Sequence, residues 1–264
     1  MDTDQDIYEY RILNRKCYEN IDSSIFFKHF HDFYELYVFV SGEGYYTIES
    51  NVYQLRPYDA FLIQPAQYHF LTLTNTTHYE RILIWFSDKD VPSSLLDSFG
   101  NKNIYVNIKD KPILNNLFFG PYWDTFSTYS RSDLEILSQL KLKEFLIHLK
   151  NTDTLSSASE HVSINPIVKK ALKYINENLS EDLNIKKIAD AVFVSCSYLS
   201  HLFQNTCKIS IMEYVRQKKI LAAKELIKSG CTPTEVFKKY GFNNYSTFYR
   251  NFKKHYSVSP RLKN

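Results

Sequence analysis

The 264-residue chain has no long apolar run and only four cysteines. No stretch is long and apolar enough to cross a membrane, and the N-terminus lacks the apolar core of a signal peptide, so we expect a cytoplasmic protein. The cysteines are Cys17, Cys196, Cys207 and Cys231. They show no CxxC spacing and are expected to be reduced thiols, with a redox-sensing pair as the alternative. No motif for phosphoryl transfer or nucleophilic catalysis stands out, so we expect neither an enzyme nor a cofactor.

The chain also has little net charge, +3 at neutral pH, but this small value hides two oppositely charged parts. Residues 1–164 carry 14 Lys and Arg against 22 Asp and Glu, a net charge of −8. Residues 165–264 carry 18 against 7, a net charge of +11. The length and this asymmetry favour two domains, and the basic part indicates a polyanionic partner, most simply nucleic acid. The acidic part would repel DNA and is expected to have another task.

Aromatic residues, in contrast, are abundant, with 21 Tyr and 19 Phe. Short β-type segments follow one another from residue 25 to about residue 86, and turn residues such as Gly42 and Gly44 separate them. This spacing is typical of a β-sandwich or barrel. The predicted strands are residues 33–40, 45–49, 52–55, 60–64, 69–73 and 79–86, with a turn at 42–44 and a loop-like region over 87–112.

A helical pattern begins at residue 113 and continues to about residue 150. Ser132 is the predicted N-cap of its main helix, in which apolar residues recur at i, i+3, i+4 and i+7 from Leu142. This helix either packs against the barrel or pairs with its copy in a second subunit, and the sequence does not separate the two. Residues 151–163 are polar, rich in Ser and Thr and without periodicity, and we interpret them as an interdomain linker.

Beyond residue 165 the sequence predicts only helices, over residues 167–178, 185–192, 196–206, 211–229, 233–240 and from about 245 onward. A short helix, a turn and a second, capped helix occur twice, first at 185–206 and again at 233–255. In the second unit, Gly241 permits a sharp turn and Asn243 or Asn244 can cap the helix that follows. Such a unit is a helix-turn-helix. A single unit is equally well a surface hairpin with solvated charges, and the repeat favours the first interpretation.

The long helix predicted between the two units gives their separation. About 19 residues at about 1.5 Å each span roughly 28 Å. Successive major grooves on one side of B-DNA lie about 34 Å apart. The sequence therefore predicts that one chain places two recognition helices in adjacent major grooves.

Residues 166–264 resemble the DNA-binding domain of the AraC/XylS family of bacterial transcription regulators. The matching stretches are LNIKKIADAVFVSCSYLSHLF, MEYVRQKKILAAKELI and GFNNYSTFYRNFKKHYSVSP. Residues 29–86, with HFHDFYELYVFVSGEG, are similar to the cupin-type ligand-binding domain that often precedes it. The resemblance implies a regulator, most often an activator, that works with RNA polymerase and forms a homodimer. It also implies a small effector inside the barrel, with a sugar as the commonest precedent.

The expected fold class is therefore α+β and multidomain. A cupin-like β-barrel with a helical hairpin precedes an all-α domain, in which a long helix joins two helix-turn-helix units. The sensor domain is expected at residues 1–150, with its barrel at about 25–86 and its helices at about 113–150. The linker is expected at 151–164 and the DNA-binding domain at 165–264.

Carried over position by position, the resemblance implies which side chains meet DNA. Those expected to do so are Ser197, Ser200, His201, Tyr245, Ser246, Tyr249, Arg250 and Lys253. Arg250 is suited to a bidentate contact with a guanine, whereas Lys253 more readily meets a phosphate. The alternative for any one of them is an exposed residue without a partner.

The DNA-binding domain also departs from the family pattern. Gln204 and Asn205 stand where a Lys pair is usual, so the first recognition helix is less basic than typical. Lys208 and Ser257 replace the Gly that usually follows each recognition helix. Each of them must adopt a left-handed conformation, or its helix must end differently.

One spacing in the β region resembles the first motif of the cupin barrels: His29-x-His31, then Glu35, then Gly42. The second motif, which ends at His69, is present in a worn form. In metal-bearing cupins His29, His31, Glu35 and His69 would be ligands, and such a set can hold a divalent transition metal. Because both glycines of the second motif are missing, we favour a hydrogen-bonded pocket lining and expect no metal.

The expected effector-binding residues are polar or aromatic groups in or beside the predicted strands: His31, Glu35, Tyr37, Tyr46, His69 and Arg81. Tyr37 and Tyr46 are suited to stacking on the face of a sugar. The alternation of residues along the strands does not say which of the six point inward. A satisfied polar core is the rival interpretation for each of them.

Two other functions are compatible with the same residues. One is a cupin metalloenzyme with a DNA-binding appendage, which would hold a stoichiometric metal. The other is a DNA-binding protein whose barrel senses nothing and only dimerises.

Overall fold

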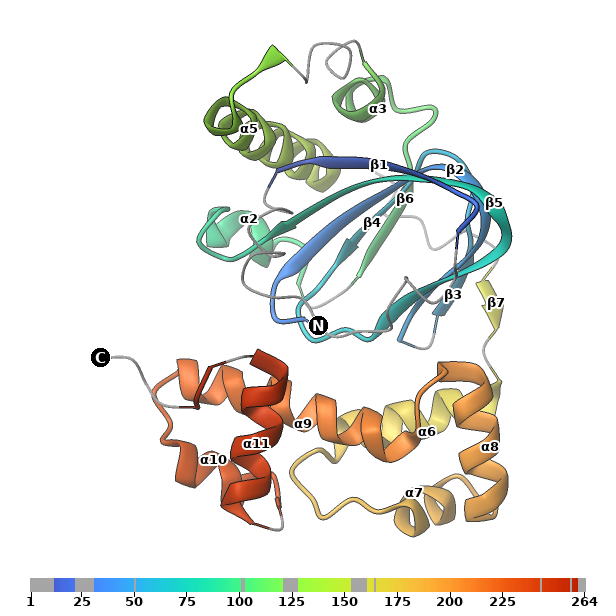
Figure 1. The fold of residues 1–264 in the computed structure, drawn as a ribbon, viewed down its shortest axis with the longest axis vertical. Coiled ribbons are helices and arrows are strands. Elements are labelled where there is room, and N and C mark those ends of the chain that lie inside the picture. The colour runs from blue at the N-terminus through green and yellow to red at the C-terminus, as the bar shows by residue number, and fades with distance from the viewer. Residues whose placement is uncertain are drawn as a thin grey trace.

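The computed structural model describes residues 12–21, 31–49, 51–100, 103–120, 128–152, 161–163, 165–242, 244–256 and 258–260. A curved antiparallel sheet with helices on one side forms the N-terminal part, and an all-helical C-terminal part lies beneath it in the view of Figure 1. The fold class predicted from the sequence is confirmed.

The N-terminal part is built on a seven-stranded sheet with the hydrogen-bonded order β1-β5-β2-β3-β7, and β4 and β6 branch from β2. Its strands are β1 (Asn14–Glu19), β2 (Tyr34–Ile48), β3 (Asn51–Gln54), β4 (Asp59–Ile63), β5 (His69–Phe86), β6 (Ile104–Asn107) and β7 (His161–Ser163). The first half of β2 pairs with β4 and the second half with β3, while β5 follows β2 along its other edge. The sheet therefore curls around the two long strands β2 and β5.

Both long strands merge segments that the sequence predicted as separate. The merged segments are residues 33–40 with 45–49, and residues 69–73 with 79–86. The turn predicted at 42–44 is therefore wrong, because β2 continues through it with shifts in its pairing to β5. A Cβ on Gly44 would lie only 2.5 Å from the carbonyl oxygen of Thr72. Glycine at this point permits the close approach of the two strands rather than a reversal of the chain.

Two segments expected to be irregular contain regular structure. The region 87–112 holds the short helix α2 (Ser93–Asp97) and the strand β6, which pairs with β4. The segment 151–164, expected to be a linker, includes β7, which pairs with β3. Strands of three or four residues are too short to show a clear period of two in the sequence.

Helices α2, α3 (Pro112–Phe119) and α5 (Arg131–Lys150) cover one face of the sheet (Figure 1). Leu36 and Val38 of β2 share a hydrophobic core with Phe145 of α5. The alternate residues Tyr37 and Phe39 belong to a separate cluster on the opposite face, which we call the inner face. The period of two along β2 thus divides the strand between a helix-covered face and the inner face.

Helix α5 packs against the sheet through its predicted stripe, but it begins at a different cap. The hydroxyl of Ser130 accepts a hydrogen bond from the backbone N–H of Asp133 at 3.2 Å. Ser130 is therefore the N-cap, and the predicted cap Ser132 lies inside the helix. The spacing of three residues to Asp133 is what an N-cap side chain requires.

The C-terminal part consists of α6 (Pro166–Glu177), α7 (Ile185–Ala191), α8 (Cys196–Cys207), α9 (Ile211–Lys228), α10 (Pro233–Lys239) and α11 (Tyr245–Tyr256). These bounds agree closely with the predicted helices, because capping side chains mark most of the starts. The side chains that accept a hydrogen bond from a first-turn N–H are those of Asn165, Asn184, Ser195, Ser210, Thr232 and Asn244.

Helix α9 belongs to two hydrophobic cores at once. Tyr214 and Leu221 pack with α6, α7 and α8, whereas Ile220 and Ile227 pack with α10 and α11. The two helix-turn-helix units therefore share one rigid helix. In the part of the chain that the structure describes, no helix is both long and apolar enough to span a bilayer.

Candidate functional site: a nucleic-acid interface and a buried polar cluster

One side of helix α8 is fully buried in the core, and the opposite side faces outward. Ser195 caps it by accepting a hydrogen bond from the N–H of Tyr198 at 3.2 Å, and Leu199 and Phe203 are completely buried. The side chains predicted to meet DNA lie away from that core, with Ser197 and His201 exposed and Ser200 half-buried. The Ser200 hydroxyl donates to the carbonyl oxygen of Cys196 at 2.8 Å, so its oxygen still has acceptor capacity.

Helix α11 repeats this arrangement with a more basic outer face. Asn244 caps it by accepting from the N–H of Thr247 at 2.7 Å, and the other predicted cap, Asn243, lies outside the described residues. Phe248 and Phe252 are buried. The predicted DNA-contacting residues Tyr245, Ser246, Arg250 and Lys253 are exposed, and Tyr249 is half-buried. The Arg250 guanidinium contacts only the hydroxyl of Thr247 among the contacts described, at 3.5 Å.

The end of α8 resolves one departure from the family pattern. Lys208 adopts a left-handed conformation with φ of +62°, and its N–H donates to the carbonyl oxygen of Gln204. Lysine therefore fills the position where glycine is usual, with some backbone strain. The corresponding Ser257 lies outside the described residues.

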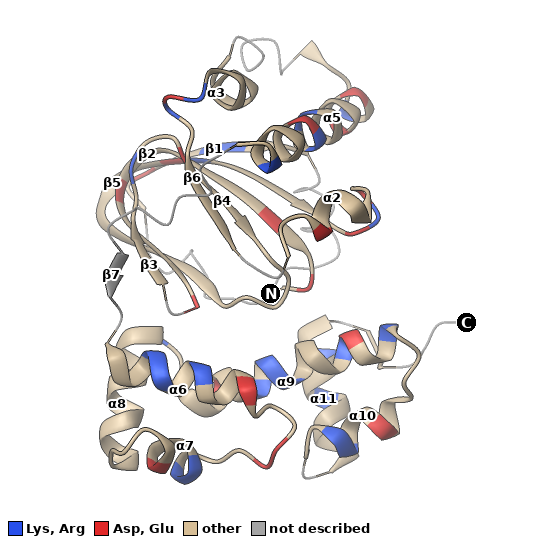
Figure 2. Ribbon diagram, turned by 180° about the vertical axis from the view of Figure 1, so that it is seen from behind, with Lys and Arg blue, Asp and Glu red and all other residues tan. Residues whose placement is uncertain are grey.

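Basic residues are spread unevenly over this part of the molecule. Figure 2 shows Lys and Arg on α6, α7, α9, α10 and α11, whereas α8 carries none. Attraction to phosphates must therefore come from the helices around α8 rather than from α8 itself. The polar groups that α8 itself exposes include the hydroxyl of Ser197 and the imidazole of His201.

The second candidate site is a buried polar cluster on the inner face, formed by His31, Glu35, His69, Tyr46 and Trp85. The Glu35 carboxylate accepts hydrogen bonds from the indole N–H of Trp85 at 2.7 Å and from the hydroxyl of Tyr46 at 2.9 Å. The Nε2 atoms of His31 and His69 lie 3.2 Å and 3.6 Å from the same carboxylate. Burial alone would raise the pKa of Glu35, but the two imidazoles outweigh it and hold that pKa well below its usual range.

A hydrogen bond at Nδ1 of each imidazole determines which ring atom faces Glu35. Nδ1 of His31 lies 2.8 Å from the carbonyl oxygen of Phe33, and Nδ1 of His69 lies 2.8 Å from that of Gln67. A carbonyl oxygen only accepts, so each Nδ1 carries a hydrogen and each Nε2 points at the carboxylate. Burial lowers the pKa of His31 and so disfavours a second proton on its ring, although the contact with Glu35 opposes this shift. A cation between the rings and the carboxylate would make the arrangement favourable. The ligand atoms of His31, Glu35 and His69 all lie within 4.8 Å of one another, which suits a divalent transition metal.

The other predicted effector residues lie on the same inner face. Tyr37 and Tyr46 stack on each other, with ring centroids 4.5 Å apart and planes 14° from parallel. The Tyr37 hydroxyl pairs with that of Tyr79 at 2.9 Å, and the half-buried Arg81 lies over the ring of Tyr18. The structure thus brings the six predicted residues together on one face, but their aromatic rings already contact one another.

One member of the cluster was not predicted from the sequence, and one predicted residue lies outside the part of the chain that the structure describes. Trp85 was counted only as part of a predicted strand, although its period-two position beside Leu83 puts it on the inner face. His29, the remaining residue of the cupin motif, lies outside the described residues.

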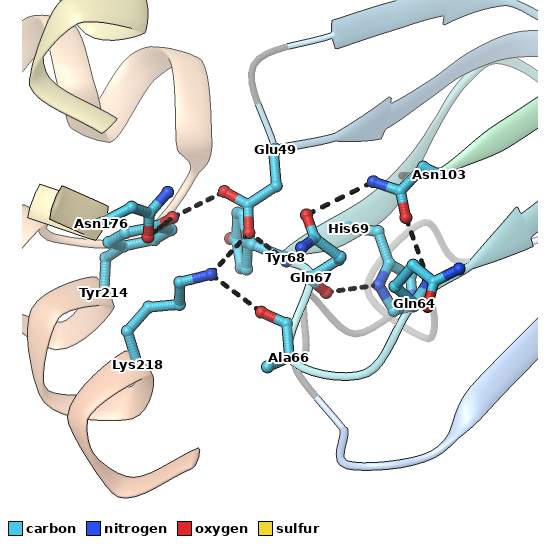
Figure 3. A network of polar contacts seen from close by, with 10 residues as sticks. All are labelled: Glu49, Gln64, Ala66, Gln67, Tyr68, His69, Asn103, Asn176, Tyr214 and Lys218. Atoms are coloured by element: carbon cyan, nitrogen blue, oxygen red, sulfur yellow. Dashed lines mark hydrogen bonds and ion pairs between the residues drawn. The ribbon is translucent and has the colours of Figure 1, made fainter. Parts of the chain in front are cut away.

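A joint between the two domains centres on Glu49, at the turn between β2 and β3 (Figure 3). Its carboxylate accepts from the ammonium of Lys218 at 2.8 Å, from the hydroxyl of Tyr214 at 2.7 Å and from the backbone N–H of Tyr68 at 2.9 Å. Lys218 also donates to the carbonyl oxygen of Ala66 at 2.9 Å. We call these four residues and Ala66 the Glu49 joint.

Tyr68 extends this joint into the core of the first helix-turn-helix unit. Its ring packs in the same hydrophobic cluster as Leu199 and Phe203 of α8. Its hydroxyl donates to the carbonyl oxygen of Cys207, at the C-terminal end of α8, at 2.7 Å. The sensor domain therefore holds the end of α8 opposite to the capped N-terminus.

Asp32 makes a second contact, with the far end of α9. Its carboxylate lies 2.6 Å from the ammonium of Lys224 and 3.3 Å from that of Lys228. Burial opposes the ionisation of Asp32, but the two ammonium groups outweigh it and lower the pKa of this carboxyl. Lys224 also lies over the ring of Tyr256, in the last turn of α11, 3.8 Å from its centroid. The sensor domain thus contacts the C-terminal end of α8 directly, and it reaches the last turn of α11 through Lys224 of α9.

Sequence reasoning did not find these interdomain residues, although one of them carries a weak signal. Lys218 follows Tyr214 by four residues and precedes Leu221 by three, so a charge interrupts an apolar stripe. It is 8% exposed. A charged residue on a buried helix face requires a partner elsewhere, but the sequence alone does not say which.

The sequence models of two protein families match this chain. The sequence model of a family described as an AraC-like ligand binding domain matches residues 16–118. That of a helix-turn-helix domain family matches residues 188–262.

Two relatives, one aligned over most of this chain and one over about a third of it, are described as a transcriptional regulator and a transcription factor. The chain is 25% identical over 254 residues to YfiF of Bacillus subtilis (strain 168), an uncharacterized HTH-type transcriptional regulator, across 89% of this chain and 77% of the relative. It is 32% identical over 97 residues to the probable transcription factor PqrA of Proteus vulgaris, across 36% of this chain and 80% of the relative. The crystal structure of ToxT from Vibrio cholerae O395 aligns with 94% of this chain and 92% of that chain, at 16% identity and a TM-score of 0.36.

We expect Glu35→Gln to lower the free energy of unfolding by about 2–4 kcal/mol at neutral pH, because an amide replaces a buried carboxylate that four groups surround. The folded-state pKa of Glu35 is lowered, so its ionised form stabilises the protein above the unfolded pKa of about 4.3. That contribution is lost as the pH falls toward the folded value. The difference between wild type and variant should therefore narrow below about pH 4, as measured by urea unfolding.

The matched control is Glu43→Gln, which removes an exposed carboxylate from the same strand. It should change the unfolding free energy by less than about 0.5 kcal/mol. If the Glu35→Gln difference stayed constant from neutral pH to about pH 3.5, the ionised state assigned to Glu35 would be wrong.

Arg250→Ala should lower the affinity for a specific duplex by about 1–3 kcal/mol and relax the preference at one base pair. The physical reason is the loss of a planar donor that matches two acceptors on a guanine. Fluorescence anisotropy with a selected duplex and its single-base variants measures both effects. Lys150→Ala, which removes one exposed positive charge from α5, serves as the control. Unchanged affinity and specificity would remove Arg250 from the DNA-contacting set.

Proposed function

Because the chain belongs to the AraC/XylS family of transcription regulators, we propose that it inserts α8 and α11 side by side into two successive major grooves of promoter DNA. The position of these helices at the two ends of α9 carries the proposal (Figure 1). Eighteen residues at about 1.5 Å each make α9 about 27 Å long, close to the distance of about 34 Å between successive grooves. The net charge of +11 on residues 165–264 supplies attraction to phosphates, so binding weakens steeply with salt.

The test uses a duplex selected from random DNA and two derivatives, with five or ten base pairs inserted between the protected grooves. Five base pairs turn the second groove to the opposite face, and ten restore the face but double the separation to about 68 Å. A single rigid α9 cannot span either arrangement. Each insertion should lower the affinity by at least about tenfold. A ten-base-pair insertion placed outside the footprint is the control, and full affinity for the inner ten-base-pair derivative would contradict the proposal.

We also propose that the inner face recognises the effector, through the polar cluster around Glu35. The cluster is buried, carries ionisable groups and lies beside two stacked tyrosines, which together suit a small polar molecule with hydroxyl groups, such as a sugar. A thermal-shift screen against sugars and other small metabolites identifies the class. A screen in which no compound raises the melting temperature would instead favour a barrel that only dimerises.

The sequence connects this cluster to the DNA-binding domain through neighbouring residues. His31 belongs to the cluster and Asp32 contacts Lys224 of α9. On the second segment, His69 belongs to the cluster and Tyr68 contacts the end of α8. A ligand that moves either histidine therefore moves a contact to a helix-turn-helix unit, and we propose this as the route from effector to DNA.

Both contacts lie toward the C-terminal ends of the recognition helices rather than their capped N-terminal ends, directly at α8 and through Lys224 at α11. This arrangement orders the two units before DNA binds, which lowers the entropy lost on binding. We call the arrangement in which both interdomain contacts are formed the closed arrangement, and we propose that it is the state that binds DNA.

Asp32→Asn should lower DNA affinity by roughly three- to tenfold, although Asp32 lies in the sensor domain. The reason is the loss of the ion pairs that hold the second unit in place. Asp110→Asn removes the same charge from an exposed site on the sensor domain and should leave the DNA affinity unchanged. Comparing the two variants therefore separates the ordering of the DNA-binding units from the long-range repulsion between a carboxylate and DNA. Equal affinities of the two variants, measured by anisotropy at one salt concentration, would show that the Asp32 contact does not order the DNA-binding units.

The activator role, the contact with RNA polymerase and the homodimer are further parts of the proposal. For the homodimer, the outer side of α5 exposes Ile136, Leu140 and Ile147, which lie on one stripe at spacings of four and seven residues. Such a stripe suits pairing with the same helix of a second copy. Sedimentation velocity measures the mass, and transcription in vitro from a promoter with the selected site decides between activation and repression.

A metal-dependent role is the second candidate, favoured by the two Nε2 atoms that face Glu35. Elemental analysis of protein purified without added metal decides it. Stoichiometric metal that is lost with His31→Ala would support a metal-bearing cupin domain. An unloaded protein that still responds to a small metabolite would support the sensor.

A further inference from the structure

The turn of the first helix-turn-helix unit contains an aromatic residue that the fold does not use. Phe193 lies between α7 and α8 and is 92% exposed, the largest exposed fraction among the large hydrophobic residues that the structure describes. Its backbone is left-handed, with φ of +60°. A bulky residue rarely adopts this conformation, because its Cβ approaches the backbone carbonyl oxygen. Phe193 therefore combines a strained backbone with exposed apolar surface.

The second helix-turn-helix unit builds the same turn with glycine. Gly241 has φ of +61° and its N–H donates to the carbonyl oxygen three residues earlier, as does the N–H of Phe193. The N–H of the next residue, Phe242 or Val194, donates to the carbonyl oxygen five residues earlier in both units. Residues 193 and 241 are therefore structurally equivalent, and both close a helix in the same way.

This comparison separates the role of the backbone from the role of the side chain. A Cβ on Gly241 would approach no described atom closer than 3.9 Å, so space does not demand glycine there. The left-handed backbone alone accounts for it. The first unit has the same backbone but carries Phe, which gains nothing from packing inside the chain. Because the strained backbone of Phe193 brings no gain in packing within the chain, we expect its side chain to contact a molecule outside the protein.

The position of Phe193 indicates what it contacts. It precedes the N-cap Ser195 by two residues, at the N-terminal end of α8 near the exposed Ser197. The opposite end of α8, at Cys207, is held by the sensor domain. Lys186 of α7 is exposed on the same unit, and α8 itself carries no Lys or Arg. An apolar ring beside a short polar recognition surface would strengthen a contact that lacks positive charge.

We propose that Phe193 is a further DNA-contacting residue, which packs its ring against apolar atoms at the edge of the major groove that α8 enters. The apolar atoms available there are thymine methyl groups and the CH groups of deoxyribose. This inference rests on the proposed DNA binding through α8. It adds a contact outside the hydrogen-bonding residues of α8, and it gives the two units different modes of recognition.

The test is Phe193→Gly, which installs the residue that the second unit already uses. The melting temperature should stay the same or rise, because glycine removes the strain. Affinity for the selected duplex should fall about tenfold, because the ring no longer buries apolar surface against DNA. The slope of affinity against salt concentration should not change, because no charge is lost. Phe193→Asn, which also tolerates a left-handed backbone, should behave like Phe193→Gly.

Duplexes with deoxyuridine in place of thymidine identify the contacted atoms. If the substitution weakens wild type and leaves Phe193→Gly unaffected, the ring contacts a thymine methyl group. If it affects both proteins equally while the affinity difference between them persists, the ring contacts deoxyribose.

The inference is overturned if Phe193→Gly and wild type bind the selected duplex with equal affinity. Equal affinity combined with lost transcription would assign the ring to a protein partner and would likewise overturn it. A loss of affinity accompanied by a lower melting temperature in both variants would assign Phe193 to folding. If wild type itself selects no duplex, the proposed function fails first and this inference fails with it.

Discussion

The arrangement of the two domains depends on one buried ion pair, between Glu49 of the sensor domain and Lys218 of α9. The Glu49 side chain is 13% exposed and the Lys218 side chain is 9% exposed. If the domains moved apart while either group stayed buried, the charge of that group would be uncompensated. Tyr214 and the N–H of Tyr68 satisfy the remaining capacity of the carboxylate. A buried pair of this kind is a weak source of net stability, because desolvation offsets most of the attraction. Its value lies in geometry, since only one relative position of the domains satisfies every donor and acceptor.

The next residue along α9 does for the helix-turn-helix units what Lys218 does for the domains. The ammonium of Lys219 donates to the carbonyl oxygens of Glu181 at 2.8 Å and Tyr240 at 2.7 Å, and burial lowers its pKa. Glu181 lies in the loop after α6, and Tyr240 ends α10. Two consecutive lysines therefore point to different partners: one joins α9 to the sensor domain, and the other joins the loop before the first unit to the end of α10 in the second. The rigid spacing of α8 and α11 follows from α9 itself and from this bond across it.

Local signals in the sequence predicted the helical part well and the sheet less well. The helices of the C-terminal part begin at capping residues such as Ser195 and Thr232 and follow a clear apolar period, both of which are local properties. The turn predicted at 42–44 was wrong because glycine has two roles, and only the partner strand β5 shows that Gly44 serves close approach. The charged residues of the Glu49 joint could not be paired from sequence, because their partners lie more than 150 residues away and each one alone resembles a surface charge.

The polar cluster and the interdomain contacts are formed by neighbouring residues of the same two segments. A ligand bound at the cluster can therefore affect the contacts between the domains. His31 and His69 face Glu35, while the adjacent Asp32 and Tyr68 face the DNA-binding domain. The two segments are themselves joined, because the N–H of Ala66 donates to the carbonyl oxygen of His31 at 2.8 Å. A ligand shifts the equilibrium between closed and open domains only by the difference in its affinity for the two states. Coupling energies between sites are typically about 1–3 kcal/mol, which corresponds to roughly 5- to 150-fold in affinity. One or two of these bonds gained or lost is enough for a change of that size, so the effector does not need to rearrange the sheet to change DNA binding.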